Sequence, residues 1–201
     1  MADLVLASSN PGKVREFQAL LGSTWRVLPQ SDFGVVPVNE TGSTFLANAL
    51  LKARNAARLT GLPALADDSG LEVDALNGAP GVRSARYAGP EADDAANNVT
   101  LLAALSGVPE IQRTARYRCV MVWTDGPDDP APLIAEGVWE GRILTEPRGR
   151  GGFGYDPVFL DPESGMAAAE LGADVKNAKS HRGRAFAKLQ KLLPRPRLST
   201  G

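Results

Sequence analysis

Cysteine and histidine are almost absent from this chain: its 201 residues include one of each. The lone Cys119 excludes a disulfide framework and a cysteine-based zinc cluster. The lone His181 excludes histidine-rich metal centres. A divalent metal would therefore be held by carboxylate oxygens, which suit Mg²⁺ better than Zn²⁺.

An excess of one charge and long apolar runs are also lacking. The chain has 22 Lys and Arg against 23 Asp and Glu, a net charge of −1. This balance argues against a basic nucleic-acid-binding surface over the whole molecule, although it allows a local anion site. No segment approaches the roughly 18 apolar residues of a membrane span, and the N-terminus lacks the basic region of a signal peptide. We therefore expect a cytoplasmic protein that has neither a membrane nor a nucleic acid as its partner.

Predicted strands and helices alternate along the chain. Apolar runs predict strands at 4–7, 25–28, 71–76, 114–124, 133–143 and 158–160. Helical spacing and capping residues predict helices after residue 12 and at 44–59, 92–106 and 182–193. The strands 114–124 and 133–143 flank a turn and should pair antiparallel. The pattern indicates an α/β fold with a long mixed sheet flanked by helices, a single domain over 1–194 and a disordered tail at 195–201.

The first motif, Ser-Ser-Asn-Pro-Gly-Lys at 8–13, lies between a predicted strand and a predicted helix. Free backbone N–H groups, the helix dipole and the charge of Lys13 favour an anion there. The segment is not a P-loop, because Ala7 stands where the first glycine should be and Val14 replaces the Ser or Thr. The alternative interpretation is an ordinary strand-to-helix turn with a cap.

The second motif is Asp-Asp-Ser-Gly at 67–70, directly after an apolar strand. Two adjacent carboxylates concentrate negative charge unless a cation compensates it, and Mg²⁺ with a bound phosphate would do so. Glu40, in the polar loop before the long helix, is a candidate second ligand beside Asp68. One alternative is a simple acidic turn. Another is the Asp-Ser-Gly triplet of aspartic proteases, for which only a homodimer could supply two aspartates sharing a proton.

The third motif, at 149–154, literally matches the glycine spacing G-x-G-x-x-G. Asp156-Pro157 and a short strand follow it where a dinucleotide-binding loop needs a helix, so we reject that fingerprint. What is left is a flexible loop that presents Phe153 and Tyr155 as a stacking surface for a flat ligand. The alternative is a glycine-rich connector whose aromatic rings turn into the core.

The fourth motif is a cluster of cationic residues at the start of the last predicted helix. Its members are Lys176, Lys179, His181, Arg182 and Arg184. The helix dipole disfavours cations at this position, so an anionic or polar ligand would ease the conflict. A Ser-His-Asp hydrolase would also need His181, but no G-x-S-x-G elbow accompanies it.

Taken in order, these motifs resemble the inosine/xanthosine triphosphate pyrophosphatase family, which removes deaminated purine nucleoside triphosphates. The resemblance runs from about residue 4 to residue 193 and includes Gly-Ala-Pro-Gly at 78–81. One departure is Ser9, where many relatives have glycine. The resemblance implies a fold of two lobes with a central nucleotide cleft, Mg²⁺ as cofactor, a purine nucleoside triphosphate as substrate and a homodimer.

The resemblance also implies roles for particular residues. Glu40 and Asp68 would coordinate Mg²⁺, and Asp68 is the residue that the family uses as general base to activate water. The products would be nucleoside monophosphate and pyrophosphate. The implied triphosphate-binding residues are Ser8, Ser9, Asn10, Pro11, Gly12, Lys13 and Lys52. The implied residues for the nucleoside end are Ser69, Phe153, Gly154, Tyr155, Asp156, Lys176, His181 and Arg182.

Selection of a deaminated base follows from donor and acceptor chemistry. Deamination of adenine replaces a 6-amino donor with a 6-oxo acceptor, and a donor-only guanidinium such as Arg182 would favour the oxo form. Mispaired buried polar groups supply discrimination on the order of 10⁴. Guanine also carries a 6-oxo group, so Arg182 alone does not explain its rejection. Two alternatives are a pyrophosphatase of similar fold for other modified nucleotides and a nucleotide-binding protein without turnover.

Overall fold

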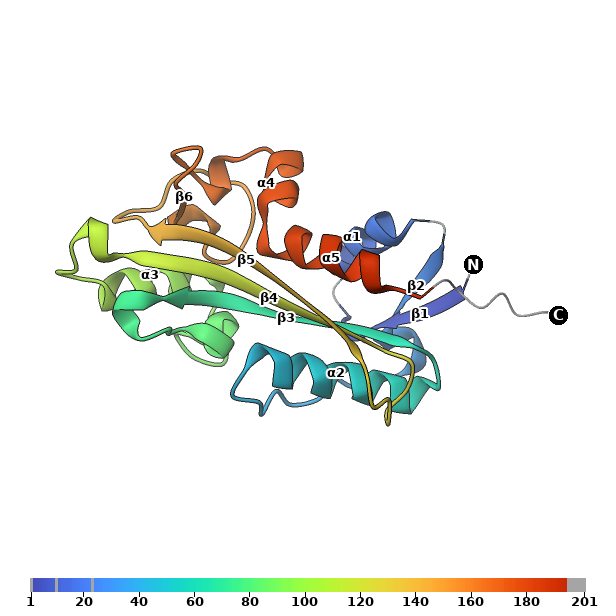
Figure 1. The fold of residues 1–201 in the computed structure, drawn as a ribbon. Helices are drawn as coiled ribbons and strands as arrows, with labels where there is room; N and C mark the ends of the chain where they lie inside the picture. The colour runs from blue at the N-terminus through green and yellow to red at the C-terminus, as the bar shows by residue number, and fades with distance from the viewer. Residues whose placement is uncertain (1, 10, 23, 195–201) are drawn as a thin grey trace. The chain divides into compact units, whose positions relative to one another are not determined.

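The computed structural model describes residues 2–9, 11–22 and 24–194. Seven strands form one sheet in the order β2-β1-β3-β4-β5-β6-β7, which confirms the predicted α/β class (Figure 1). The strands are β1 (Ala2–Leu6), β2 (Trp25–Pro29), β3 (Ala64–Val73), β4 (Thr114–Thr124), β5 (Leu133–Ile143), β6 (Phe159–Asp161) and β7 (Met166–Ala167). The helices are α1 (Pro11–Leu21), α2 (Phe45–Thr60), α3 (Asp94–Ala104), α4 (Ala173–Lys179) and α5 (His181–Leu192).

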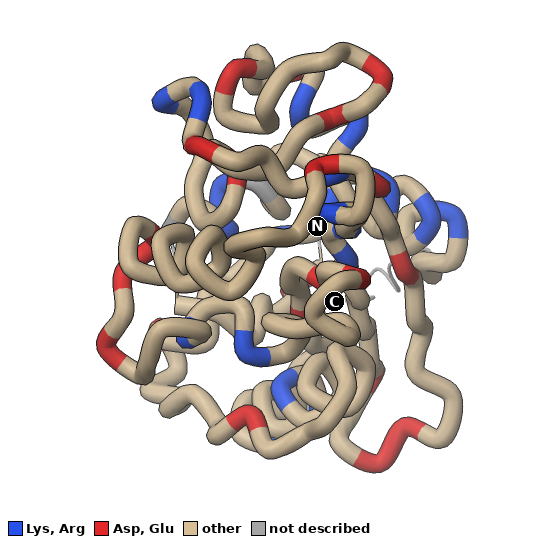
Figure 2. Tube along the Cα trace, turned by 90° about the vertical axis from the view of Figure 1, so that its left-hand side faces the viewer, with Lys and Arg blue, Asp and Glu red and all other residues tan. Residues whose placement is uncertain are grey.

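Charges of both signs are interspersed along the trace (Figure 2). This distribution accords with the near balance of 22 basic and 23 acidic residues in the sequence. Across the described part of the chain, no helix combines the length and the apolar character that a membrane span requires.

The chain divides into two compact units. The first comprises Met1–Asp68, Val120–Glu136 and Ala185–Gly201, and the second comprises Ser69–Cys119 and Gly137–Arg184. The borders fall inside β3, β4, β5 and α5, so each of these elements contributes residues to both units. The predicted tail at 195–201 and the predicted binding residue Asn10 lie outside the described residues.

In the first unit, parallel strands carry helices on both faces. Strand β1 pairs in parallel with β2 on one side and with the start of β3 on the other. The connection from β1 to β2 through α1 and the connection from β2 to β3 through α2 run across the sheet in opposite directions, and α1 and α2 lie on opposite faces, as Figure 1 shows. Phe17 of α1 packs edge-to-face on Phe186 with ring centroids 6.3 Å apart, and Ala56 of α2 packs against Val5 and Ala64. The small alanine side chain allows α2 to lie close to the strands.

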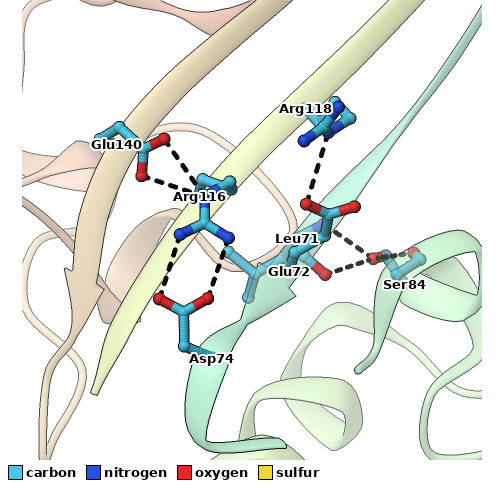
Figure 3. A network of polar contacts seen from close by, with 8 residues as sticks. Leu71, Glu72, Asp74, Ser84, Arg116, Arg118 and Glu140 are labelled. Carbon is cyan, nitrogen blue, oxygen red and sulfur yellow. Dashed lines mark hydrogen bonds and ion pairs between the residues drawn. The ribbon is translucent and has the colours of Figure 1, made fainter. Parts of the chain in front are cut away.

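In the second unit, one face of the strands forms an apolar core. Leu101 and Leu105, from α3 and its end, pack there with Leu71, Tyr117 and Trp139. The opposite face carries charged side chains, which form a network of ion pairs between β3, β4 and β5 (Figure 3). The buried and half-buried positions of β4 therefore alternate from residue 114 to residue 119, as predicted for a strand.

The segment 67–70, which was expected to follow a strand and had an acidic turn as the alternative, lies inside a strand. Strand β3 continues through it without interruption, and the strand predicted at 71–76 is the second half of β3, which ends at Val73. A 3₁₀ segment, Asp74–Leu76, follows. Two adjacent aspartates are tolerated inside a strand because both carboxylates are paired with lysines. The short elements α4 and β7 were not predicted, because neither has enough residues for a clear apolar period.

Candidate active site

The two adjacent aspartates of β3 each meet a lysine from a different helix. Successive side chains of a strand point to opposite faces. The Lys13 ammonium of α1 lies 2.8 and 2.9 Å from the two carboxylate oxygens of Asp67. The Lys52 ammonium of α2 donates to Oδ1 of Asp68 at 2.8 Å. The compensating cations that the sequence requires at these carboxylates are therefore present as lysines.

Lys52 also brings Glu40 into the group. Its ammonium donates to Oε1 of Glu40 at 2.8 Å, so the carboxylates of Glu40 and Asp68 face one cation. Asn48 completes the group, because its amide donates to Oδ2 of Asp68 at 3.2 Å. The side-chain oxygen of Asn48 accepts a hydrogen bond from the Gly42 backbone at 2.8 Å and so ties the loop before α2 to that helix.

The sequence interpretation assigned no role to Asn48 or to Asp67. Asn48 lies four residues before Lys52 on α2, a spacing that places both side chains on one helix face. That spacing is the signal that could have identified it. For Asp67 the signal was the adjacent pair of carboxylates, but nothing in the sequence indicated that Lys13 would contact it.

The surroundings of Asp68 shift its acidity. Burial raises the pKa of the Asp68 carboxyl, the charge and hydrogen bond of Lys52 lower it, and the charge of Glu40 raises it; the resulting pKa lies above the usual value. Burial lowers the pKa of Lys52, but the charge and hydrogen bonds of Asp68 and Glu40 outweigh burial and keep the amine protonated. A carboxylate with a raised pKa is better suited to accept a proton near neutral pH.

Glu40 and Asp68 fit a divalent cation that prefers oxygen ligands. Their oxygens already converge on the positive charge of Lys52 at 2.8 Å each. Among the described residues, no group of three or more His, Cys, Asp or Glu side chains is arranged to hold a metal. Mg²⁺ is commonly bound by one or two carboxylates together with water and substrate phosphates, so two carboxylates are enough for it.

The first turn of α1 places the positive charge of Lys13 against Asp67. Ser8 is half-buried and its backbone N–H donates to the Leu6 carbonyl at 2.7 Å, which makes a tight turn after β1. Ser9 and Gly12 are exposed, and Pro11 opens α1, where its missing N–H leaves no helical hydrogen bond unmade. The predicted anion-binding segment is therefore a strand–turn–helix unit whose lysine points to Asp67.

In the second unit, an exposed aromatic ring lies among cationic groups. Phe153, in the glycine-rich loop, is 63% exposed. The Lys176 ammonium lies 4.8 Å from the centre of its ring, and the Arg182 guanidinium carbon lies 5.9 Å from it. The structure thus brings together three predicted nucleoside-binding residues from the loop, α4 and α5. An accessible ring with cations close to it offers a surface on which a flat base can stack.

The glycine-rich loop is held by acidic and amide side chains. Oδ2 of the buried Asp156 accepts hydrogen bonds from the Phe153 backbone at 2.8 Å and from Lys176 at 2.5 Å. The backbone N–H of Gly154 donates to Asp94 at 2.6 Å, and its carbonyl accepts from Asn98 at 2.8 Å. Asp94 and Asn98 belong to α3 and had no predicted role. These contacts fix the loop that carries Phe153.

The two aromatic residues of this loop have different environments. Tyr155 is buried, and its hydroxyl donates to the Ser84 carbonyl at 2.7 Å. The loop therefore combines both predicted interpretations, because Phe153 is accessible while Tyr155 turns into the core. Ser69, next to Asp68 in β3, is half-buried.

The junction of α4 and α5 positions the last cationic residues. The Ser180 hydroxyl accepts the Gly183 backbone N–H at 3.0 Å and caps α5. A side chain at Gly183 would overlap the Asn177 carbonyl, so glycine permits this close junction. The His181 ring stacks on Tyr117 with centroids 4.7 Å apart and planes 11° apart.

The predicted cationic cluster at the start of the last helix separates into two groups. Lys176 and Arg182 lie near Phe153. Lys179 pairs with Asp161 and Glu163 at 2.9 and 2.8 Å. Arg184 donates to a backbone carbonyl of β5. The structure thus gives Lys179 and Arg184 partners that hold the fold.

Comparison with known proteins places the chain in a family. A family model described as the Ham1 family matches residues 4–192. A dITP/XTP pyrophosphatase of Thioalkalivibrio sulfidiphilus is 61% identical over 184 residues, which cover 91% of this chain and 94% of that protein. The structure of a Ham1 protein from Coxiella burnetii superposes with a TM-score of 0.92 at 51% identity, covering 96% of this chain and 98% of that chain. A nucleoside-triphosphatase / dITP/XTP pyrophosphatase from Mycobacterium abscessus gives a TM-score of 0.80 at 44% identity, with coverage of 93% and 98%. The resemblance drawn from the motifs is therefore confirmed, and the chain belongs to the Ham1 family.

Proposed function

We propose that this protein hydrolyses deaminated purine nucleoside triphosphates, namely ITP, dITP and XTP, to the monophosphate and pyrophosphate. Relatives that are 61% and 59% identical to it over most of their length bear the name dITP/XTP pyrophosphatase. The observation that carries the proposal is Asp68, a buried carboxylate with a raised pKa that shares the Lys52 ammonium with Glu40.

The triphosphate end is assigned to residues of the first unit. Lys13 and Lys52 would bind phosphate oxygens, since each ammonium has three donors and can contact a phosphate as well as its carboxylate. Asp68 would accept the proton of the attacking water. Glu40 and Asp68 would hold Mg²⁺, which supplies positive charge that offsets the charge of the triphosphate.

The nucleoside end is assigned mainly to residues of the second unit. The base would stack on Phe153, and Arg182 would donate to the 6-oxo group that distinguishes hypoxanthine and xanthine from adenine. Asp68 and Ser69 are consecutive in β3, so the chain passes directly from one group of proposed contacts to the other. The proposal includes a single two-lobed domain and a cytoplasmic homodimer. Sedimentation of the purified protein tests the dimer.

Product analysis tests the proposed reaction. With dITP and Mg²⁺, the protein should release pyrophosphate and dIMP in equal amounts, and a chelator should stop the release until Mg²⁺ is restored. Stepwise appearance of inorganic phosphate with dIDP would contradict the reaction type. Tight binding of dITP without any product would favour a nucleotide-binding protein without turnover.

A further inference from the structure

Tyr117 of β4 contacts two separate parts of the proposed base-binding region. Its ring stacks on His181, with centroids 4.7 Å apart and planes 11° apart. Its hydroxyl donates to Oδ1 of Asp156 at 3.4 Å. One buried side chain thus touches the first residue of α5 and the first residue of the 3₁₀ segment, Asp156–Val158, that follows the glycine-rich loop.

Asp156 extends this contact to the exposed part of the region. While Oδ1 faces Tyr117, Oδ2 accepts hydrogen bonds from the Phe153 backbone and from the Lys176 ammonium. The carboxylate is 3% exposed, so these contacts occur where water does not compete with them. A change in the orientation of Asp156 would move both Phe153 and Lys176.

Tyr117 is itself fixed by the core of the second unit. Its ring centroid lies 4.6 Å from that of Phe159 and 6.3 Å from that of Trp139. Burial and the charge of Asp156 raise the pKa of the Tyr117 hydroxyl well above its usual value, so the group stays a hydrogen-bond donor at neutral pH. Tyr117 is 7% exposed, so it contacts His181 and Asp156 from the core side.

We propose that Tyr117 is a positioning residue for base recognition: its ring sets the plane of His181, and its hydroxyl orients Asp156 and thereby Phe153 and Lys176. This inference rests on the proposed function, because the residues that it positions are those assigned to the nucleoside end. It adds to that function a residue that acts from the core.

The substitution Tyr117→Phe separates the hydroxyl from the ring. It keeps the stacking on His181 and removes the donor to Asp156. At 3.4 Å this hydrogen bond is long, so its loss corresponds to a change of about two- to fivefold. We expect the KM for ITP to rise by about that factor, kcat to change less than about twofold, and the preference for ITP over ATP to fall.

Thr114→Val is a matched control. Thr114 lies on the same strand, and its hydroxyl also donates to an aspartate, Asp74, at 2.6 Å. Thr114 shares the half-buried positions of β4 with Arg116, which also contacts Asp74, and neither Thr114 nor Asp74 is assigned to the base. Loss of the Thr114 hydroxyl should leave the KM for ITP at the wild-type value. A general effect of losing a β4 hydroxyl would raise KM in both variants and would overturn the inference.

Binding of IMP gives a readout that does not depend on turnover. Calorimetry on the whole protein should show weaker IMP binding for Tyr117→Phe and a further loss for Tyr117→Leu, which also removes the stacking on His181. Both variants are measured well below their melting temperatures. If Tyr117→Phe binds IMP and has a KM for ITP like the wild type, or if it loses only kcat, the inference is wrong while the proposed function stands. If the wild type itself neither binds IMP nor releases pyrophosphate from ITP, the proposed function fails and the inference with it.

Discussion

Asp68 acquires its proposed role from its neighbours. Burial raises its pKa, and Lys52 and Asn48 hold both of its oxygens. Asp68→Asn keeps the shape and the contact with Asn48 but removes the proton acceptor. Loss of a general base lowers rates by about 10²- to 10⁴-fold, so we expect pyrophosphate release from ITP to fall by at least this factor. Thermal unfolding should show that the variant is still folded.

Asp3→Asn is the matched control for this experiment. Asp3 is a half-buried aspartate of β1 that forms a bidentate pair with Arg26 at 2.7 and 2.6 Å. Its substitution should leave turnover unchanged. Near-normal pyrophosphate release by Asp68→Asn would remove Asp68 from the role of base.

Arg182 is the residue to which base selection is assigned. It is buried, and its guanidinium lies 5.9 Å from the Phe153 ring. Arg182→Ala removes donors that pair with a 6-oxo group. The ratio of kcat/KM for ITP to kcat/KM for ATP should therefore fall by about tenfold or more. Arg184→Ala, two residues along the same helix, removes a hydrogen bond to the Val138 carbonyl and should leave the ratio unchanged. An unchanged ratio in Arg182→Ala would exclude Arg182 from base selection.

Residue types and spacing revealed part of the site. They pointed to Asp68, Glu40 and Phe153, and the family resemblance added Lys52; the structure gathers these residues in two groups. They did not reveal which lysine meets which carboxylate, because those pairs join residues 12 to 54 positions apart in the chain. Only the fold brings such positions together.

At the scale of elements, the junction of α4 and α5 depends on a glycine. A Cβ at Gly183 would overlap the Asn177 carbonyl. Gly183→Ala should therefore shift the start of α5, lower the free energy of unfolding by about 1–3 kcal/mol and raise the KM for ITP, since His181 and Arg182 precede it directly. Steady-state kinetics and urea unfolding measure the two effects.

Gly172→Ala controls for the general effect of adding a methyl group at α4. A Cβ at Gly172 would meet no atom within 4 Å. We expect a change in the free energy of unfolding below about 1 kcal/mol and an unchanged KM. Equal effects of the two substitutions would contradict a specific role for the close contact at Gly183.

The charged face of β3, β4 and β5 predicts a pH dependence (Figure 3). Hydrogen bonds from Arg116 and Thr114 hold the pKa of Asp74 below its usual value, and slight burial opposes them. The stabilisation is therefore present above the unfolded pKa of about 3.9 and is lost as the pH falls through the lower folded pKa. Because Asp74 is largely exposed, Asp74→Asn should lower the free energy of unfolding by less than about 1 kcal/mol at pH 7.

Urea unfolding of Asp74→Asn and the wild type at several pH values measures this effect. The difference between the two proteins should shrink in 1 M salt and vanish near pH 2. A difference that stays constant from pH 7 to pH 2 would show that the ion pairs in Figure 3 do not cause it.

For the whole molecule, alternation of strands and helices was enough to predict the fold class. Apart from β3, the long strands and helices were predicted close to their observed bounds, for example α2, expected at 44–59 and found at Phe45–Thr60. The segment 67–70 was misread because aspartate, serine and glycine are typical of turns. Their place inside β3 depends on Lys13 and Lys52, which local propensity does not take into account.

The central claim is that one protein combines triphosphate hydrolysis at Asp68 with recognition of a deaminated base by Phe153 and Arg182. The most direct measurement compares kcat/KM for pyrophosphate release from dITP, XTP, dATP and dGTP with Mg²⁺ present. We predict values for dITP and XTP that exceed that for dATP by two or more orders of magnitude, because the 6-amino group of adenine would face the donors of Arg182. Equal values for all four nucleotides, or release of inorganic phosphate in place of pyrophosphate, would contradict the account.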